Sequence, residues 1–210
     1  MDSVASIGVP AITEKKAQLL PVSLVLSAAS AVFFLIGAIG GSTSAGVIQS
    51  VPWQQDKTAK FYYGLAAFYS DATEEVVTFK DACIGTIAES DGCKFCYDNQ
   101  SSASIGLSAA SLIVSAGALV AILLRFNGDS VNLKFASVVS TILPVIFTIA
   151  NLASYSKCVS ALKDIFQDIE YGPGWILTLV GLLAVFLSFV INLLIQADGG
   201  ATSVLPVLPK

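Results

Sequence analysis

Four cysteines are the residues of this 210-residue chain with the greatest capacity for chemistry, since a thiolate can form a disulfide, exchange electrons or bind a metal. Cys83 and Cys93 are separated by nine residues, and Cys93 and Cys96 form a Cys-x2-Cys motif. Such a motif binds zinc or exchanges thiols beside a second ligand pair or in a βαβ unit, and the sequence has neither. The pattern favours structural disulfides among Cys83, Cys93, Cys96 and Cys158.

The pairing of these cysteines stays open, because four cysteines allow three connectivities. A bond between Cys83 and Cys93 would pin a strand–turn–strand segment and stabilise it by about 2–4 kcal/mol. Cys96 and Cys158 would then be left to join two different loops. Asn99 begins an Asn-Gln-Ser sequon in the same region, so it is a candidate for N-glycosylation.

The other side chains argue against catalysis. Histidine is absent, which removes the commonest general base and metal ligand, and no Gly-rich phosphate loop precedes a helix. We therefore predict a non-enzymatic protein with no catalytic residue, no metal site and no cofactor. The net charge of −4 argues against nucleic-acid binding, which requires a basic face.

The composition indicates an integral membrane protein. Hydrophobic residues make up 55% of the chain and charged residues only 12%, whereas a soluble domain carries about a quarter charged residues. Four uncharged segments of about 20 residues are each long enough to span a bilayer. We predict an all-α four-helix bundle in the lipid bilayer with these parts: N-terminus 1–18, span 19–41, loop 42–102, span 103–124, loop 125–134, span 135–157, loop 158–174, span 175–196 and tail 197–210.

The orientation follows from the basic residues that flank the predicted spans. Lys15, Lys16, Arg125, Lys134 and Lys210 all lie on one side, which the positive-inside rule makes cytosolic, together with both termini. The loops 42–102 and 158–174 then lie outside. All four cysteines fall in these two loops, where an oxidising compartment permits disulfides. The plasma membrane is the location that agrees best with this arrangement.

The first outer loop is predicted to form a small extracellular antiparallel β-sheet. Segments 47–53, 60–69 and 75–87 are rich in β-forming residues and are separated by turn signals. In the second outer loop, apolar residues at helical spacing up to Ile169 predict a short amphipathic segment. Aromatic residues are enriched at protein interfaces, although half of an alternating set must face its own core. The predicted interaction surface comprises Trp53, Phe61, Tyr63, Gly64, Leu65 and Phe68.

The predicted spans carry few polar features. Small residues recur at four-residue spacing in span 103–124, which lets helices approach closely, either within one bundle or between neighbouring proteins. Asn151 and Asn192 are expected to form interhelical hydrogen bonds without reaching each other. Apart from Lys157 at the boundary of span 135–157, no predicted span contains Asp, Glu, Lys or Arg, which argues against a pump or coupled transporter.

Trp53, the pair Gly64-Leu65 and the spacing from Cys83 to Cys93, in the first outer loop of a four-span chain, resemble the claudin superfamily, which includes peripheral myelin proteins. Ala66 stands where the family has a third motif aromatic, the following gap is longer, and two cysteines are extra, so the resemblance is to a divergent member. It implies a left-handed four-helix bundle capped by an outer β-sheet through which copies associate laterally or between cells.

These observations predict a claudin-like protein that organises membrane, cell-surface or cell-junction assemblies through its disulfide-pinned first loop and lateral helix packing. Its expected partners are the lipid bilayer and other membrane proteins or copies of itself, bound through the first loop and the small-residue helix faces. The alternative is an accessory or anchoring subunit of a larger membrane complex, such as a channel, a receptor or a surface filament.

Overall fold

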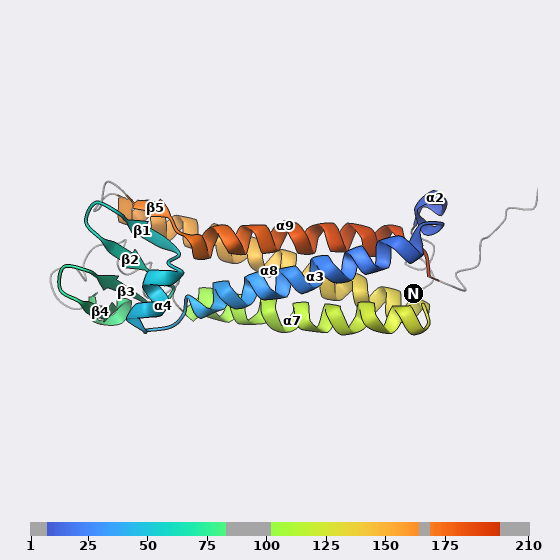
Figure 1. Cartoon of the computed structure of the whole chain (residues 1–210), viewed down its shortest axis with the longest axis horizontal. Coiled ribbons are helices and arrows are strands. Elements are labelled where there is room, and N and C mark those ends of the chain that lie inside the picture. The colour runs from blue at the N-terminus through green and yellow to red at the C-terminus, as the bar shows by residue number, and fades with distance from the viewer. Residues whose placement is uncertain (1–7, 83–101, 164–168, 198–210) are drawn as a thin grey trace, which may run out of the picture.

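The computed structural model of this chain describes residues 8–82, 102–163 and 169–197. Within these ranges, long helices lie side by side and a small β-sheet stands at one end of them (Figure 1). Four helices are long and apolar enough to cross a membrane. The prediction of four such helices with a small antiparallel sheet is therefore confirmed. The helices are α3 (Lys16–Ile39), α7 (Ser102–Asn127), α8 (Val131–Lys163) and α9 (Pro173–Leu194).

The helices extend beyond the predicted spans. α7 continues past Arg125 to Asn127, and α8 begins at Val131, so Arg125 and Lys134 lie inside helices instead of in a polar connector. The long helices therefore carry charged residues at this end, beyond the uncharged segments 103–124 and 135–156. These charges are tolerated within helices because they are buried against one another and against polar side chains, as described below.

The long helices have an apolar outside and a polar inside. α3 contacts α7 and α9, and α8 contacts the same two helices. Val25 and Ile113 are 67% and 70% exposed, while Ser23 and Ser27 of α3 are fully buried. A water-soluble helical protein has the opposite distribution, because burial of apolar surface drives its folding. Apolar lipid tails supply no such force, so interhelical contact in a membrane relies on small residues and hydrogen bonds.

The sheet joins both predicted outer loops. Its strands are β1 (Gln54–Asp56), β2 (Phe61–Tyr63), β3 (Ala67–Ser70), β4 (Glu75–Thr78) and β5 (Ile169–Tyr171), in the spatial order β4-β3-β2-β1-β5 with every neighbouring pair antiparallel. The first four strands belong to the first loop, and β5 belongs to the second. β1 therefore pairs with a strand more than one hundred residues away in sequence.

Several local predictions for the first loop are wrong. Segment 47–53 was expected to be a strand, but it contains most of helix α4 (Ala45–Ser50). Ile48 of this helix is fully buried with Ala67 and Tyr69 of the sheet, so packing overrides the β-forming tendency of the segment. The expected single strand 60–69 is two strands that turn at Gly64, since its aromatic residues pair across β2 and β3.

The remaining two corrections concern β4 and the second loop. The predicted strand 75–87 ends at Thr78, because Asp81 hydrogen-bonds Thr78 and starts the short helix α5 (Phe79–Ala82). Ile169 was assigned to a helical pattern, but it lies in β5 opposite Asp56. Strand pairing with β1 satisfies the backbone groups that a short isolated helix would leave to water.

The two described ends of the chain lie together at the end of the helices opposite the sheet (Figure 1). A short helix, α2 (Pro10–Thr13), precedes α3. The backbone N–H of Val9 donates a hydrogen bond to the carbonyl of Leu194 at 3.0 Å, and the N–H of Gln196 donates to the Thr13 hydroxyl at 3.1 Å. We call this end the connector end, because the link between α7 and α8 lies there, and the other the sheet end.

Candidate functional site

Trp53 is the centre of the junction between the sheet and the helices. It directly precedes β1 and is fully buried. Its indole N–H donates a hydrogen bond to the carbonyl of Gly37 in α3 at 3.0 Å, and its backbone N–H donates to the carbonyl of Tyr63 at 2.8 Å. Tyr155 of α8 packs edge-on against the indole, with ring centroids 4.9 Å apart. One residue thus connects α3 and α8 through its side chain and β2 through its backbone.

Glycines make room for this indole. A Cβ atom at Gly40, at the end of α3, would lie less than 3.0 Å from two atoms of the Trp53 indole. A Cβ atom at Gly174, in the first turn of α9, would lie 2.9 Å from the indole Cδ1. Both distances are closer than real Cβ contacts, so glycine is needed at these positions for the indole to fit between α3 and α9.

The Gly64-Leu65 pair brings the β2–β3 turn to the same place. The N–H of Leu65 donates a 2.7 Å hydrogen bond to the carbonyl of Gly40, and the N–H of Gly64 donates to the carbonyl of Ala67 at 2.8 Å. Leu65 is 1% exposed and packs in one cluster with Trp53 and with Leu152 of α8. The first-loop motif residues that the structure describes therefore meet three glycines of α3 and α9. We call this set the Trp53 anchor: Trp53, Gly64, Leu65, Gly37, Gly40 and Gly174.

The six residues predicted as an interaction surface lie mostly inside this region. Trp53, Tyr63 and Leu65 are at most 3% exposed, and Phe61 and Phe68 are partly buried against the same cluster. Their side chains hold the sheet to the helices and do not form an exposed contact surface. Burial raises the pKa of Tyr63 above its ordinary value, and the negative charge of Asp56 adds to this effect, so the phenol stays neutral.

The exposed part of the sheet consists mainly of two turns at its far end. The β1–β2 turn carries Lys60 and Lys57, whose ammonium lies 2.9 Å from the Glu170 carboxylate of β5, whereas Asp71, Glu74 and Glu75 lie at the β3–β4 turn. Lys60 and Glu74 have left-handed backbone geometry with φ of 56°, which strand reversal imposes despite its cost for these residue types. The two turns are neighbours, as the N–H of Asp71 donates to the carbonyl of Lys60 at 3.2 Å. Basic and acidic groups thus stand side by side.

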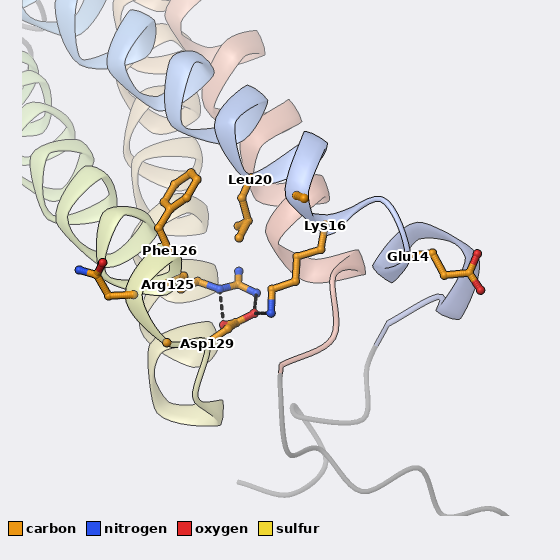
Figure 2. Close-up of a pocket in the computed structure, with 9 residues that line it drawn as sticks. Glu14, Lys16, Leu20, Arg125, Phe126 and Asp129 are labelled. Atoms are coloured by element: carbon orange, nitrogen blue, oxygen red, sulfur yellow. Dashed lines mark hydrogen bonds and ion pairs between the residues drawn. The ribbon is translucent and has the colours of Figure 1, made fainter.

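The connector end holds a buried cluster of charges that the sequence did not predict (Figure 2). Arg125 donates two hydrogen bonds to the carboxylate of Asp129, at 2.6 and 2.8 Å, and Lys16 lies 3.0 Å from the same carboxylate. Arg125 also donates to the side-chain oxygen of Asn192 at 2.8 Å. Lys134 is fully buried and near enough to interact electrostatically with Arg125 and Asp129. The cluster ties α3, α7, α8 and α9 together.

The two asparagines make interhelical hydrogen bonds, as predicted, and do not contact each other. The amide N–H of Asn192 donates to the Ser23 hydroxyl of α3 at 2.6 Å, and Ser23 and Ser188 share a 2.7 Å bond. Nearer the sheet, the amide of Asn151 donates to the Ser108 hydroxyl at 2.8 Å. These bonds join α3 to α9 and α7 to α8 inside the protein.

The small residues of α7 divide between two faces. Ser104, Ser108, Ser111 and Ser115 are buried between the helices. Gly106 and Gly117 face outward, and a Cβ atom at either position would meet nothing within 4 Å. The serines thus serve packing within the chain, while the two glycines lie on the exposed face of α7 with Ile113 between them.

Several predicted sites lie outside the described residues. They are Cys83, Cys93, Cys96, Asn99 and the side chain of Cys158, whose backbone belongs to α8. In the part of the chain that the structure describes, no three acidic, histidine or cysteine side chains are grouped to hold a metal ion. Comparison with models of protein families, with curated proteins and with solved structures finds no match. The functional assignment therefore rests on the geometry of this chain.

Proposed function

We propose that this chain is a non-enzymatic integral membrane protein that organises assemblies at a membrane or cell surface by presenting its sheet. The observation that carries this proposal is the Trp53 anchor. Direct hydrogen bonds from the sheet to the ends of α3 and α9, with glycines packed against the indole, hold the sheet in a fixed position beyond the helices. A rigid projection of this kind suits recognition, since little conformational entropy is lost on binding.

The proposed orientation places the connector end in the cytosol and the sheet outside, at the plasma membrane. At the connector end, Lys15 immediately precedes α3, and the other basic residues lie within the first or last turns of the long helices: Lys16, Arg125 and Lys134. Short basic segments next to spans are retained on the cytosolic side. Disulfides among the four cysteines and the relationship to the claudin superfamily belong to this proposal, which the position of the sheet at one end of four apolar helices supports.

A second copy of the chain is the partner that the exposed turns fit best. The β1–β2 turn of one copy, with exposed Lys60 and with Lys57 shared with Glu170 of the same copy, is complementary to the acidic β3–β4 turn of another. Such head-to-tail contacts propagate along a row of copies. Exposed ion pairs contribute about 0.2–1 kcal/mol each, so the contact is weak for one pair of copies. In a membrane, many copies held in one orientation add such weak contacts together.

Charge reversal tests this contact. Two differently tagged copies are expressed together, and their co-recovery in mild detergent is measured. The variant K57E/K60E should reduce co-recovery several-fold, because acidic turns then face acidic turns. Mixing it with E74K/E75K copies should restore co-recovery, because each contact again joins opposite charges. The control K80E/K157E changes two exposed lysines elsewhere at the sheet end and leaves the turns unchanged.

The result of this experiment decides the proposal. An equal loss of co-recovery in K57E/K60E and in K80E/K157E would refute a specific contact between turns. Failure of the mixed reversed copies to associate would refute it as well, because electrostatic complementarity is restored in that mixture.

The alternative is an accessory subunit, in which a helix of another protein docks beside Gly106 or Gly117, where α7 offers open space on its exposed face. Gentle purification from native membranes with mass identification of bound chains separates the two functions. Stoichiometric recovery of one larger, unrelated protein supports the accessory function. Recovery of copies of this chain alone supports self-association.

A further inference from the structure

A fully buried glutamine side chain lies in β1. Gln54 is 0% exposed, and among the described residues neither its amide nitrogen nor its amide oxygen has a hydrogen-bond partner. An amide that is buried without hydrogen bonds destabilises a folded protein, so buried side-chain amides are nearly always bonded to the protein or to ordered water. The Gln54 amide therefore needs a partner that the described side chains do not supply.

The strands around Gln54 place it beside the start of α9. Its Cα partners are Tyr63 of β2 and Tyr171 of β5, so the three side chains lie on one face of the sheet. The N–H of Gly174, in the first turn of α9, donates to the carbonyl of Pro52 at 2.9 Å. β1, β5 and the start of α9 thus meet at the sheet end (Figure 1). We call this junction, residues 52–54 and 171–175, the β1–α9 seam.

A second buried polar group belongs to the same seam. The indole N–H of Trp175, the third residue of α9, is buried and has no acceptor in the part of the chain that the structure describes. The Trp175 ring stacks on that of Tyr171, the neighbour of Gln54 in the sheet, with centroids 4.2 Å apart. It also packs against the cluster that contains Tyr63 and Ile169, which lie on the same face of the sheet as Gln54. Both polar groups are therefore enclosed at one junction of sheet and helix.

Water is the ligand that these groups fit. Gln54 offers two N–H donors and one carbonyl acceptor, and Trp175 offers one further donor. A water molecule donates and accepts, and buried waters make about three hydrogen bonds to groups of this kind. An anion is disfavoured by the carboxylate of Asp56, which is buried on the same face of the sheet two residues along β1. A neutral ligand of the size of water meets the donors and the acceptor together.

We propose that the β1–α9 seam holds ordered water that is hydrogen-bonded to the Gln54 amide and the Trp175 indole. This water fastens the sheet to α9 at a second place, beside the direct contacts of the Trp53 anchor. The inference depends neither on the orientation of the chain in a membrane nor on association between copies. It therefore stands or falls separately from the proposed function.

Water contacts of the two indole N–H protons test the proposal. The chain has two tryptophans, so indole-15N labelling of the purified full-length chain in detergent allows both to be observed, and Trp175→Phe assigns the signals. Trp175 should show a cross-peak to water with opposite signs in the laboratory and rotating frames, which distinguishes bound water from proton exchange. Trp53 is the internal control, because its indole N–H is bonded to the Gly37 carbonyl and should show no such peak.

Substitution of Gln54 gives a second test. Gln54→Leu removes the amide at nearly constant volume, so it should weaken the water peak of Trp175 at least about threefold and lower Tm by several degrees. The matched control, Gln55→Leu, makes the same change on the other, partly exposed face of β1 and should leave the peak unchanged. The peak should also persist in Y63F/Y171F, which removes two hydroxyl groups that exchange protons with water.

Three results would overturn the proposal. The first is the absence of a bound-water peak at Trp175 in the wild type. The second is a higher Tm for Gln54→Leu than for the wild type, since an apolar side chain is more stable than an amide that is truly unpaired. The third is a peak that is kept in Gln54→Leu but lost in Y63F/Y171F, which would assign it to tyrosine hydroxyl protons.

Discussion

Replacement of Gly40 by alanine is the most direct test of the Trp53 anchor. Gly40 ends α3 with ordinary right-handed backbone geometry, φ of −57°, so alanine causes no backbone strain by itself. The added methyl group would lie less than 3.0 Å from two atoms of the Trp53 indole. The indole is fully buried and hydrogen-bonded to the Gly37 carbonyl, so it can move only by breaking that bond.

The expected cost follows from these contacts. Overpacking of a buried site costs about 1–3 kcal/mol. Loss of the buried hydrogen bond adds about 1 kcal/mol. The reduced flexibility of the unfolded chain offsets about 0.4–1 kcal/mol of this. Gly40→Ala should therefore destabilise the protein by about 1–4 kcal/mol. The control, Gly46→Ala in α4, places its methyl group where nothing lies within 4 Å, and it should be neutral or slightly stabilising.

Thermal unfolding in detergent and tryptophan fluorescence measure the two consequences. The chain has two tryptophans, so a Trp175→Phe background leaves Trp53 as the reporter. Gly40→Ala should lower Tm by several degrees and shift the emission of Trp53 to longer wavelength as the indole becomes more accessible to water. An unchanged emission maximum together with the Tm of the Gly46→Ala control would refute the tightly packed anchor.

Three further predictions concern the interior, the alkaline limit and the cysteines. Asn192→Ala should lower the unfolding free energy by about 1–3 kcal/mol, because it removes a buried hydrogen bond from the charged Arg125. Asn151→Ala should lower it by only about 0.6 kcal/mol, because it removes a neutral interhelical bond. Thermal melts in detergent compare the two variants. Because the folded-state pKa of Tyr63 is raised, stability should fall as pH rises above the ordinary value of 10.0, and Tyr63→Phe should reduce this fall in alkaline melts. Non-reducing peptide mapping should link Cys83 to Cys93, and a link from Cys83 to another cysteine would refute the first-loop model.

The helices could be predicted from the sequence because length and apolarity are local properties. Residues 103–124 and 175–196 are uncharged and long enough for a bilayer; the first segment lies within α7, and the second lies within α9 up to its end at Leu194. The strands were harder to predict. β5 has three residues, and it exists because Gln55 and Asp56, far away in sequence, offer an edge for pairing. No local sequence pattern around Ile169 indicates that this segment pairs with β1.

The charged cluster was missed for a different reason. Arg125 and Asp129 are four residues apart, which is a helical ion-pair spacing, but the Asn-Gly pair between them is typical of a turn. The sequence therefore suggested exposed flanking charges. An arginine at the end of an apolar span, followed four residues later by an acid, was the signal that was available. Its burial depends on Asn192 and Lys16 from two other helices, which only the fold brings together.

The anchor also determines how a force on the sheet reaches the helices. The N–H of Leu65 bonds the Gly40 carbonyl of α3, while the N–H of Gly172, before α9, bonds the Trp53 carbonyl at 2.8 Å. α3 and α9 are in turn joined near their other ends through Ser23, Ser188 and Asn192. A force applied at the turns of the sheet is thus transmitted to α3 and α9, which are themselves joined to each other. The sheet and these helices should move as one body, and the proposed row of copies would require this rigidity to keep a regular spacing.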